Sequence, residues 1–106
     1  MTTTDTIQIR RVAGAIGAEI SGIDLMAGVS DTTVTAIRRA WLEHGVLFFR
    51  NQPLQPAAFQ AFAERFGEVV EYPFVKGIEG HPLIIPVLKL AHETVNFGGI
   101  WHTDTA

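Results

Sequence analysis

Short alternating segments dominate the first quarter of the chain. Residues 7–10 and 18–23 alternate apolar and polar side chains, which is typical of half-buried strands. Gly14 and Gly17 lie between these segments, where a tight reversal needs residues that tolerate a positive φ. The glycine spacing fits neither GxGxxG nor a phosphate-binding loop, and no Lys-Ser or Lys-Thr follows. The pattern therefore predicts a β-hairpin within residues 7–25.

Helical spacing replaces this alternation after residue 30. Ser30 or Asp31 has the side chain of an N-terminal cap, and Gly45 follows His44 as a C-terminal stop. Between these signals the apolar residues recur every three or four positions. We expect a helix that runs to about His44, with one buried stripe formed by Val34, Ile37, Trp41 and Leu42.

A short apolar run and a second helical pattern come next. Residues 46–49 are continuously apolar and predict a fully buried strand, with residues 50–53 as its exit turn. Pro56 suits the first turn of a helix that Gly67 would end. The spacing places four apolar residues on one face of this helix, and we expect that face to be core: Phe59, Phe62, Ala63 and Phe66.

The sequence pattern changes after Glu68, from helical spacing to loop and strand signals. Residues 72–82 carry the proline and glycine pairs of a loop. Residues 83–90 resemble a strand in which Pro86 demands an edge position or a bulge. A second loop through residue 99 leads to a strand-like end over residues 100–106.

Composition removes several function classes. The 106 residues carry 47% hydrophobic and 18% charged side chains and a net charge of −3, which indicates a globular chain without the basic stripe that nucleic acid requires. There is no cysteine, so a disulfide framework, a thiolate metal site and a cysteine nucleophile are excluded within this sequence. We find no signal-peptide pattern or membrane-span pattern and expect a soluble cytoplasmic protein, with residues 1–6 as a disordered tail.

The pair with the clearest chemistry is His102 and Asp104. In a strand, residues i and i+2 point to the same face, so an imidazole and a carboxylate converge on one ion. Two histidines and one carboxylate form the facial triad of non-haem iron(II), and this chain would supply two of the three. From spacing alone, a hydrogen-bonded His-Asp pair in a strand without a metal is the favoured interpretation.

The choice between a metal site and a metal-free pair changes when four segments are considered in their order along the chain. They are AGAIGAEISGIDL at residues 13–25, HGVLFFRNQ at 44–52, FAERFGE at 62–68, and WHTD at 101–104. Together they closely resemble the TauD/TfdA family, the taurine and 2,4-dichlorophenoxyacetate dioxygenases and their relatives. The resemblance extends over nearly the whole chain from about Val12.

The resemblance implies an α+β or mostly β fold, a double-stranded β-helix (jelly roll) with outer helices. It implies that His102 and Asp104 bind Fe(II) and that 2-oxoglutarate and O2 are cosubstrates for a small-molecule substrate. The family's second metal histidine and its 2-oxoglutarate-binding arginine would lie beyond Ala106. We therefore expect residues 1–106 to be the N-terminal part of a single dioxygenase domain, inactive alone, and the complete protein to be a possible homo-oligomer.

The resemblance also suggests substrate contacts. Tyr72 stands near the place of a substrate histidine of the taurine enzymes, Val75 near that of a tyrosine, and Asn96 close to that of an asparagine. We expect Tyr72 and Asn96 to line the pocket of a small organic acid or a sulfonate-like substrate. Two other functions stay open: a zinc-type hydrolase or isomerase that uses the same His-Asp pair, and a non-catalytic binding or structural module.

Overall fold

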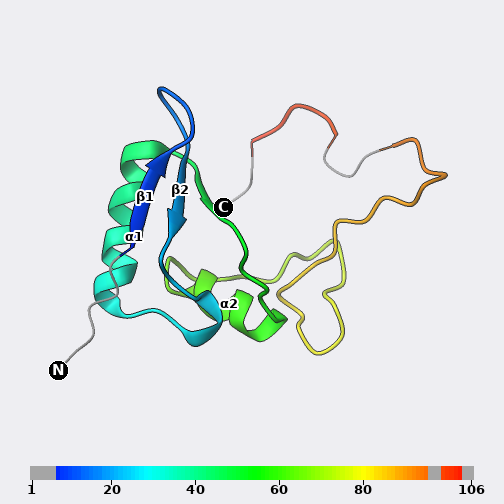
Figure 1. Ribbon diagram of the computed structural model, residues 1–106. Coiled ribbons are helices and arrows are strands. Elements are labelled where there is room, and N and C mark those ends of the chain that lie inside the picture. The colour runs from blue at the N-terminus through cyan, green and yellow to red at the C-terminus, as the bar shows by residue number, and fades with distance from the viewer. Residues whose placement is uncertain (1–6, 96–98, 104–106) are drawn as a thin grey trace. The chain divides into compact units, whose positions relative to one another are not determined.

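The computed structural model describes residues 7–95 and 99–103. These residues fall into two compact units, one ending at Val70 and the other starting at Glu71. All helices and strands of the described residues belong to the first unit (Figure 1). The predicted tail at residues 1–6 lies outside the described residues.

The first unit is built on a three-stranded sheet. Strands β1 (Gln8–Arg11) and β2 (Ala18–Ser21) pair antiparallel, which confirms the predicted hairpin. Strand β3 (Leu47–Phe49) pairs parallel with β2, so the strand order is β1-β2-β3. Backbone bonds extend this pairing, because the Ala18 amide donates to the Val46 carbonyl at 3.0 Å.

Helix α1 (Asp31–His44) connects β2 to β3 and has both predicted caps. The Ser30 hydroxyl accepts a hydrogen bond from the Thr33 amide at 3.1 Å, and so satisfies a donor of the first turn. At the other end Gly45 has φ +78°, and its amide donates to the Trp41 carbonyl at 2.8 Å. The helix lies beside β1 and β2 (Figure 1).

The core lies between α1 and the sheet. Its buried apolar side chains are Ala18, Ile20, Leu25, Ile37 and Ala40. The buried stripe of α1 consists of Thr33, Ile37, Ala40 and His44, at spacings of three and four residues. The predicted stripe is therefore right at Ile37 and wrong at Trp41 and Leu42, which are 47% and 80% exposed.

The 3-10 helix η1 (Leu25–Ala27), which the sequence did not predict, packs on α2 (Pro56–Glu64). The Gln52 side chain fastens η1, because its Oε1 accepts from the Leu25 amide at 2.9 Å and its Nε2 donates to the Ile23 carbonyl at 3.0 Å. After α2, Arg65 donates to the Val29 carbonyl and pairs with Asp31. These contacts join the segment before α1 to the segment that contains α2.

Two burial predictions fail around α2 and β3. Helix α2 begins at Pro56 as expected but ends at Glu64, before Gly67. It has no fully buried residue, and Phe59 is 51% exposed. Strand β3 was expected to be fully buried, yet Phe48 is 42% exposed. The face of α2 that was expected to be core is covered only in part, since Phe62 and Phe66 are half-buried while Phe59 and Ala63 are exposed, and in β3 only Leu47 and Phe49 are half-buried.

An ion cluster spans the sheet at Glu19. Its Oε2 accepts hydrogen bonds from Arg10 at 2.9 Å and from Arg50 at 3.1 Å. The hydrogen bond from Arg50 has the largest effect and lowers the pKa of Glu19 below its ordinary value. Burial opposes this lowering, and the hydrogen bond from Arg10 adds to it. This carboxylate therefore links the chain on both sides of β2.

The second unit contains turns and extended chain. Between residues 71 and 95 and between 99 and 103 there is no helix or multi-residue strand. The strand predicted over residues 83–90 is not formed, because Pro86 lacks an amide hydrogen and no described segment pairs with this stretch. Among the described residues, no helix has the length and apolar character needed to cross a membrane.

Candidate metal centre

His102 is the one predicted metal ligand that the structure describes. Its Nδ1 lies 2.6 Å from the Ile100 carbonyl oxygen, so the geometry assigns the proton to Nδ1, which donates to that oxygen. In this tautomer Nε2 carries the lone pair that a metal ion takes. A backbone carbonyl that fixes the other ring nitrogen is a common arrangement around ligating histidines. The imidazole therefore fits a ligand of Fe(II).

Asp104 and Asn96 lie outside the described residues, so the distance between the His102 and Asp104 side chains stays a prediction. Within residues 7–95 and 99–103, no group of three or more His, Cys, Asp or Glu side chains is placed to hold a metal ion. The support that the structure gives to iron binding thus rests on the donor type and orientation of His102.

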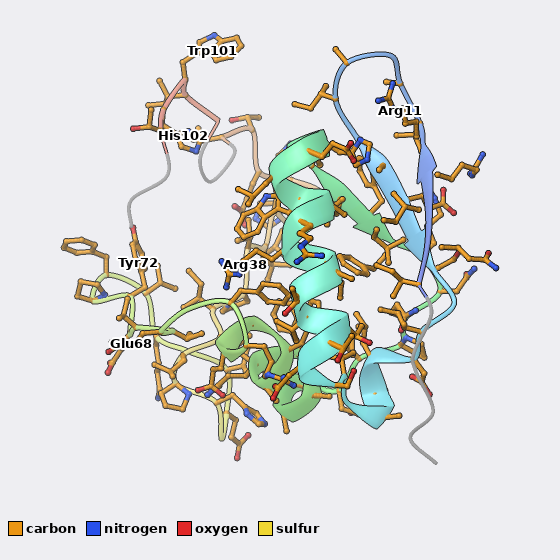
Figure 2. The ribbon with its side chains drawn as sticks, turned by 90° about the vertical axis from the view of Figure 1, so that its left-hand side faces the viewer. Arg11, Arg38, Glu68, Tyr72, Trp101 and His102 are labelled. Carbon is orange, nitrogen blue, oxygen red and sulfur yellow. The ribbon has the colours of Figure 1, made fainter. Side chains whose placement is uncertain are left out.

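The immediate surroundings of His102 differ from the prediction. Residues 99–103 form no strand, and the Trp101 side chain is fully exposed. Figure 2 shows the Trp101 ring pointing away from the adjacent backbone. A strand needs a hydrogen-bonded neighbour, and no described segment pairs with these residues. Because residues 99–103 are not in a strand, the i and i+2 alternation of a sheet does not determine the direction of the His102 side chain.

Tyr72 is the described member of the predicted substrate pair. It is 36% exposed, and its ring meets that of Phe74 edge-on with centroids 5.4 Å apart (Figure 2). Such an aromatic pair on a loop presents an apolar edge together with a phenol hydroxyl. Its role as a substrate contact stays a prediction.

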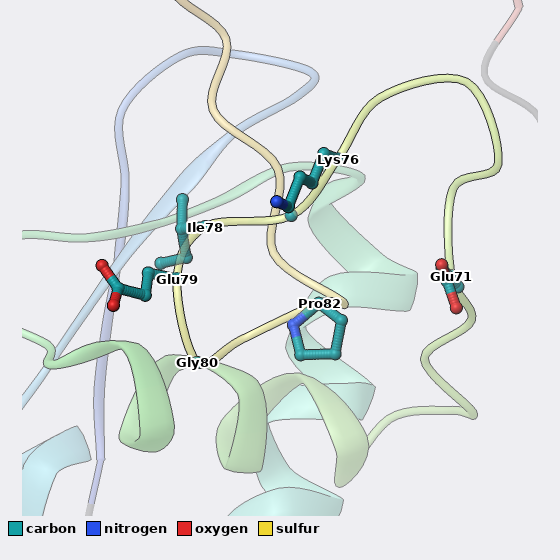
Figure 3. A pocket seen from close by; sticks show the side chains of 7 residues that line it. Glu71, Lys76, Ile78, Glu79, Gly80 and Pro82 are labelled. Atoms are coloured by element: carbon teal, nitrogen blue, oxygen red, sulfur yellow. The ribbon is translucent and has the colours of Figure 1, made fainter.

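A hollow of about 780 Å³ is lined by residues between Glu71 and Pro82, and Tyr72 is not one of them (Figure 3). Its charged lining residues are Glu71, Lys76 and Glu79. The sequence did not single these out, because charged loop residues are usually solvated and carry no spacing signal.

The turn that borders this hollow is more ordered than a loop pattern predicts. The Ile78 amide donates to the Ile84 carbonyl at 2.8 Å, and the His81 amide donates to the Ile78 carbonyl at 2.9 Å. A side chain at Gly77 would place its Cβ 2.5 Å from the Pro82 carbonyl oxygen. Only glycine permits this approach of two backbone segments, which explains the residue at position 77.

Comparisons with known proteins support the resemblance found in the sequence. The family model described as taurine catabolism dioxygenase TauD, TfdA family, matches residues 8–106, a range that includes His102 and Asp104. The chain is 41% identical over 102 residues to an alkylsulfatase of Acinetobacter baylyi, which covers 95% of this chain and 31% of that protein. It is 35% identical over 99 residues to an alpha-ketoglutarate-dependent sulfate ester dioxygenase of Pseudomonas putida, covering 92% of this chain and 32% of the relative.

Solved structures agree with these matches. A taurine dioxygenase from Burkholderia xenovorans superposes with a TM-score of 0.67 at 38% identity, over 72% of this chain and 28% of its own. The structure of AAD-2 in complex with Mn(II) and N-oxalylglycine superposes with a TM-score of 0.59 at 28% identity, over 63% of this chain and 26% of that one. The chain spans about a third of the length of the curated relatives it matches. It belongs to the TauD/TfdA family of dioxygenases.

Proposed function

We propose that the protein carrying this chain is an Fe(II)- and 2-oxoglutarate-dependent dioxygenase of organic sulfate esters. The observation that carries the proposal is the family match over residues 8–106, which includes the WHTD segment. The complex of AAD-2 with Mn(II) supports a metal-dependent relative of similar structure. We further propose that residues 1–106 belong to a single jelly-roll domain with outer helices.

His102 and Asp104 would hold the iron, His102 through Nε2 because its Nδ1 hydrogen bonds to Ile100. Iron with 2-oxoglutarate and O2 supplies the oxidising power when bound, while 2-oxoglutarate loses CO2 and becomes succinate. The hydrogen bond to Ile100 fixes the ring orientation and leaves the metal-binding nitrogen with its lone pair. A further histidine and an arginine for 2-oxoglutarate would complete this site, and we place both after Ala106 in the complete domain.

The substrate class follows from the relatives' names together with simple chemistry. One relative is named an alkylsulfatase and another a sulfate ester dioxygenase, and each aligns with more than nine tenths of this chain. Hydroxylation of the carbon that bears the sulfate group gives a hemiacetal sulfate. This product expels hydrogen sulfate and leaves an aldehyde, so an oxygenase also acts as a sulfatase. A sulfate ester therefore reconciles the two names.

The test measures products in the protein that carries this chain, supplied with Fe(II), 2-oxoglutarate and an alkyl sulfate. We expect succinate, aldehyde and sulfate in equal amounts, and none of them without O2. His102→Ala should abolish turnover, whereas His92→Ala, a change to an exposed histidine outside the WHTD segment, should leave it intact. Sulfate release that continues without O2 and 2-oxoglutarate would contradict the proposal and point to the zinc-type hydrolase.

A further inference from the structure

The sheet of the first unit has two edges of different character. At one edge all four residues of β1 are exposed, and two of them are Arg10 and Arg11. Charged side chains are typical of strands that stay at an edge, because they oppose pairing with a further strand. At the other edge the three residues of β3 are all apolar, with neither charge nor proline. Such a composition is typical of a strand that is paired on both sides.

The outer side of β3 carries backbone groups that point away from β2. Within residues 7–95 and 99–103, β2 is the one strand that pairs with β3. The Ala18 amide donates to the Val46 carbonyl at 3.0 Å. Because alternate residues of a parallel strand bond to the same neighbour, the Leu47 and Phe49 amides are directed to the open edge. This edge is therefore a template for a further strand.

An apolar groove of about 330 Å³ adjoins β3. Phe62 meets Phe49 and Phe66 edge-on there, with ring centroids 5.5 and 5.2 Å apart. Trp41 meets Phe66 in the same geometry at 6.3 Å and is 47% exposed. Side chains from α1, β3, α2 and the residues just after α2 form the lining, which includes Ile37, Trp41, Leu47, Phe49, Phe62 and Phe66. A lining of this kind has the composition of one half of a domain core.

The size of the relatives indicates what covers this groove. The chain spans 31% and 32% of the two curated relatives, which leaves about two thirds of a domain of their length outside it. The second unit does not supply the missing strand, because residues 71–95 and 99–103 form none. A second copy of the chain fits less well. It would bring a second Arg38 to the interface, and within the described residues this guanidinium lies over the Phe66 ring and pairs with no carboxylate.

We propose that the part of the domain that follows Ala106 pairs a strand with the free edge of β3 and packs apolar side chains into the groove. The sheet then continues from β3, and β1 remains its outer strand. Arg38, which donates to the Phe66 carbonyl at 3.3 Å, would meet a carboxylate or carbonyl oxygen of the covering part. The inference rests on the single domain proposed above and is independent of the chemistry at His102.

Hydrogen exchange followed by mass spectrometry tests which edge is covered, in the complete protein that carries this chain. The comparison is internal, between the peptide that contains β3 and the peptide that contains β1. We expect the Leu47 and Phe49 amides to exchange at least about a hundredfold more slowly than the β1 amides that point away from β2, because only the former are hydrogen-bonded to a further strand.

Two alanines of α2 provide a matched pair for the groove. Ala57 and Ala63 are both exposed in the described chain, but only Ala63 lines the groove. In the complete protein, Ala63→Glu would place a carboxylate under the covering part and should lower the Tm by about 5 to 10 °C. Ala57→Glu introduces the same charge on the same helix and should change the Tm by less than about 2 °C.

Three results would overturn the proposal. The first is exchange at Leu47 and Phe49 as fast as at the outward amides of β1. The second is an equal effect of Ala57→Glu and Ala63→Glu on the Tm. The third is protection of β3 that disappears on dilution together with a dimer seen in sedimentation, because a second copy would then be the cover. Succinate formation by the same unaltered protein is measured separately, so any of these results leaves the dioxygenase proposal standing or failing on its own.

Discussion

The Gln52 side chain offers the sharpest test of how the first unit is held together. It joins the end of β3 to η1 through two hydrogen bonds to backbone groups that are 27 and 29 positions away in sequence. Both bonds are partly buried, so water replaces them incompletely when the amide is removed. Gln52→Met removes the side-chain amide but keeps much of the side-chain volume, and Gln52→Ala removes the amide and most of that volume.

Each lost bond contributes about 1 kcal/mol, so we expect both variants to lose about 2 kcal/mol of unfolding free energy. With a slope of about 1 to 2 kcal/mol/M, the urea midpoint should fall by roughly 1 to 2 M. The assay is urea unfolding followed by circular dichroism. Gln55→Ala is the control, because the Gln55 side chain makes no capping hydrogen bond. Variants at position 52 that stay within about 0.5 kcal/mol of the parent would refute the reasoning.

Two further predictions concern backbone conformation and charge. Gly45→Ala should lower the unfolding free energy by about 1 to 2 kcal/mol in the same urea assay, because Gly45 has φ +78° and a Cβ there would lie 3.0 Å from Ile16. Unchanged stability would contradict the left-handed conformation at that position. The lowered pKa of Glu19 means that its ionised form, bound by Arg50 and Arg10, stabilises the folded chain above the ordinary pKa of 4.5, and that this stabilisation is lost as the pH falls through the lower folded value. The stability difference between the parent and Glu19→Gln, measured from pH 7 to 3, should therefore shrink on acidification, and a difference independent of pH would contradict the cluster.

Local signals were enough to predict much of the first unit. The glycines around the hairpin, Ser30 and Gly45 at the ends of α1, and Pro56 at the start of α2 each act within a few residues of their position. Their effects are fixed by backbone geometry and by nearby hydrogen bonds, so the sequence alone reveals them.

What the sequence did not predict depends on distant partners. The parallel pairing of β2 with β3 and the docking of η1 through Gln52 join segments about thirty residues apart. Trp41 and Phe59 are exposed because other segments leave those faces of α1 and α2 uncovered. Apolar spacing along a helix is the same whether or not a face is covered, so it could not predict this exposure.

The candidate metal centre was found through motif order rather than through geometry. The spacing of His102 and Asp104 alone favoured a simple hydrogen-bonded pair over a metal site, and the family match over residues 8–106 decided for the dioxygenase family. The predicted strand around His102 was wrong because a strand requires a partner outside the motif. The orientation of the His102 ring by the Ile100 carbonyl could not be predicted from residue types.

Paramagnetic broadening by Mn(II) tests the metal site most directly. The chain has four histidines, and their imidazole proton resonances can be followed separately by NMR in the 106-residue chain and in Asp104→Asn. The account predicts that the lowest Mn(II) concentrations broaden the His102 resonances first, and that Asp104→Asn removes this preference. Equal broadening of His81, His92 and His102, or a His102 response that Asp104→Asn leaves unchanged, would contradict a shared metal site.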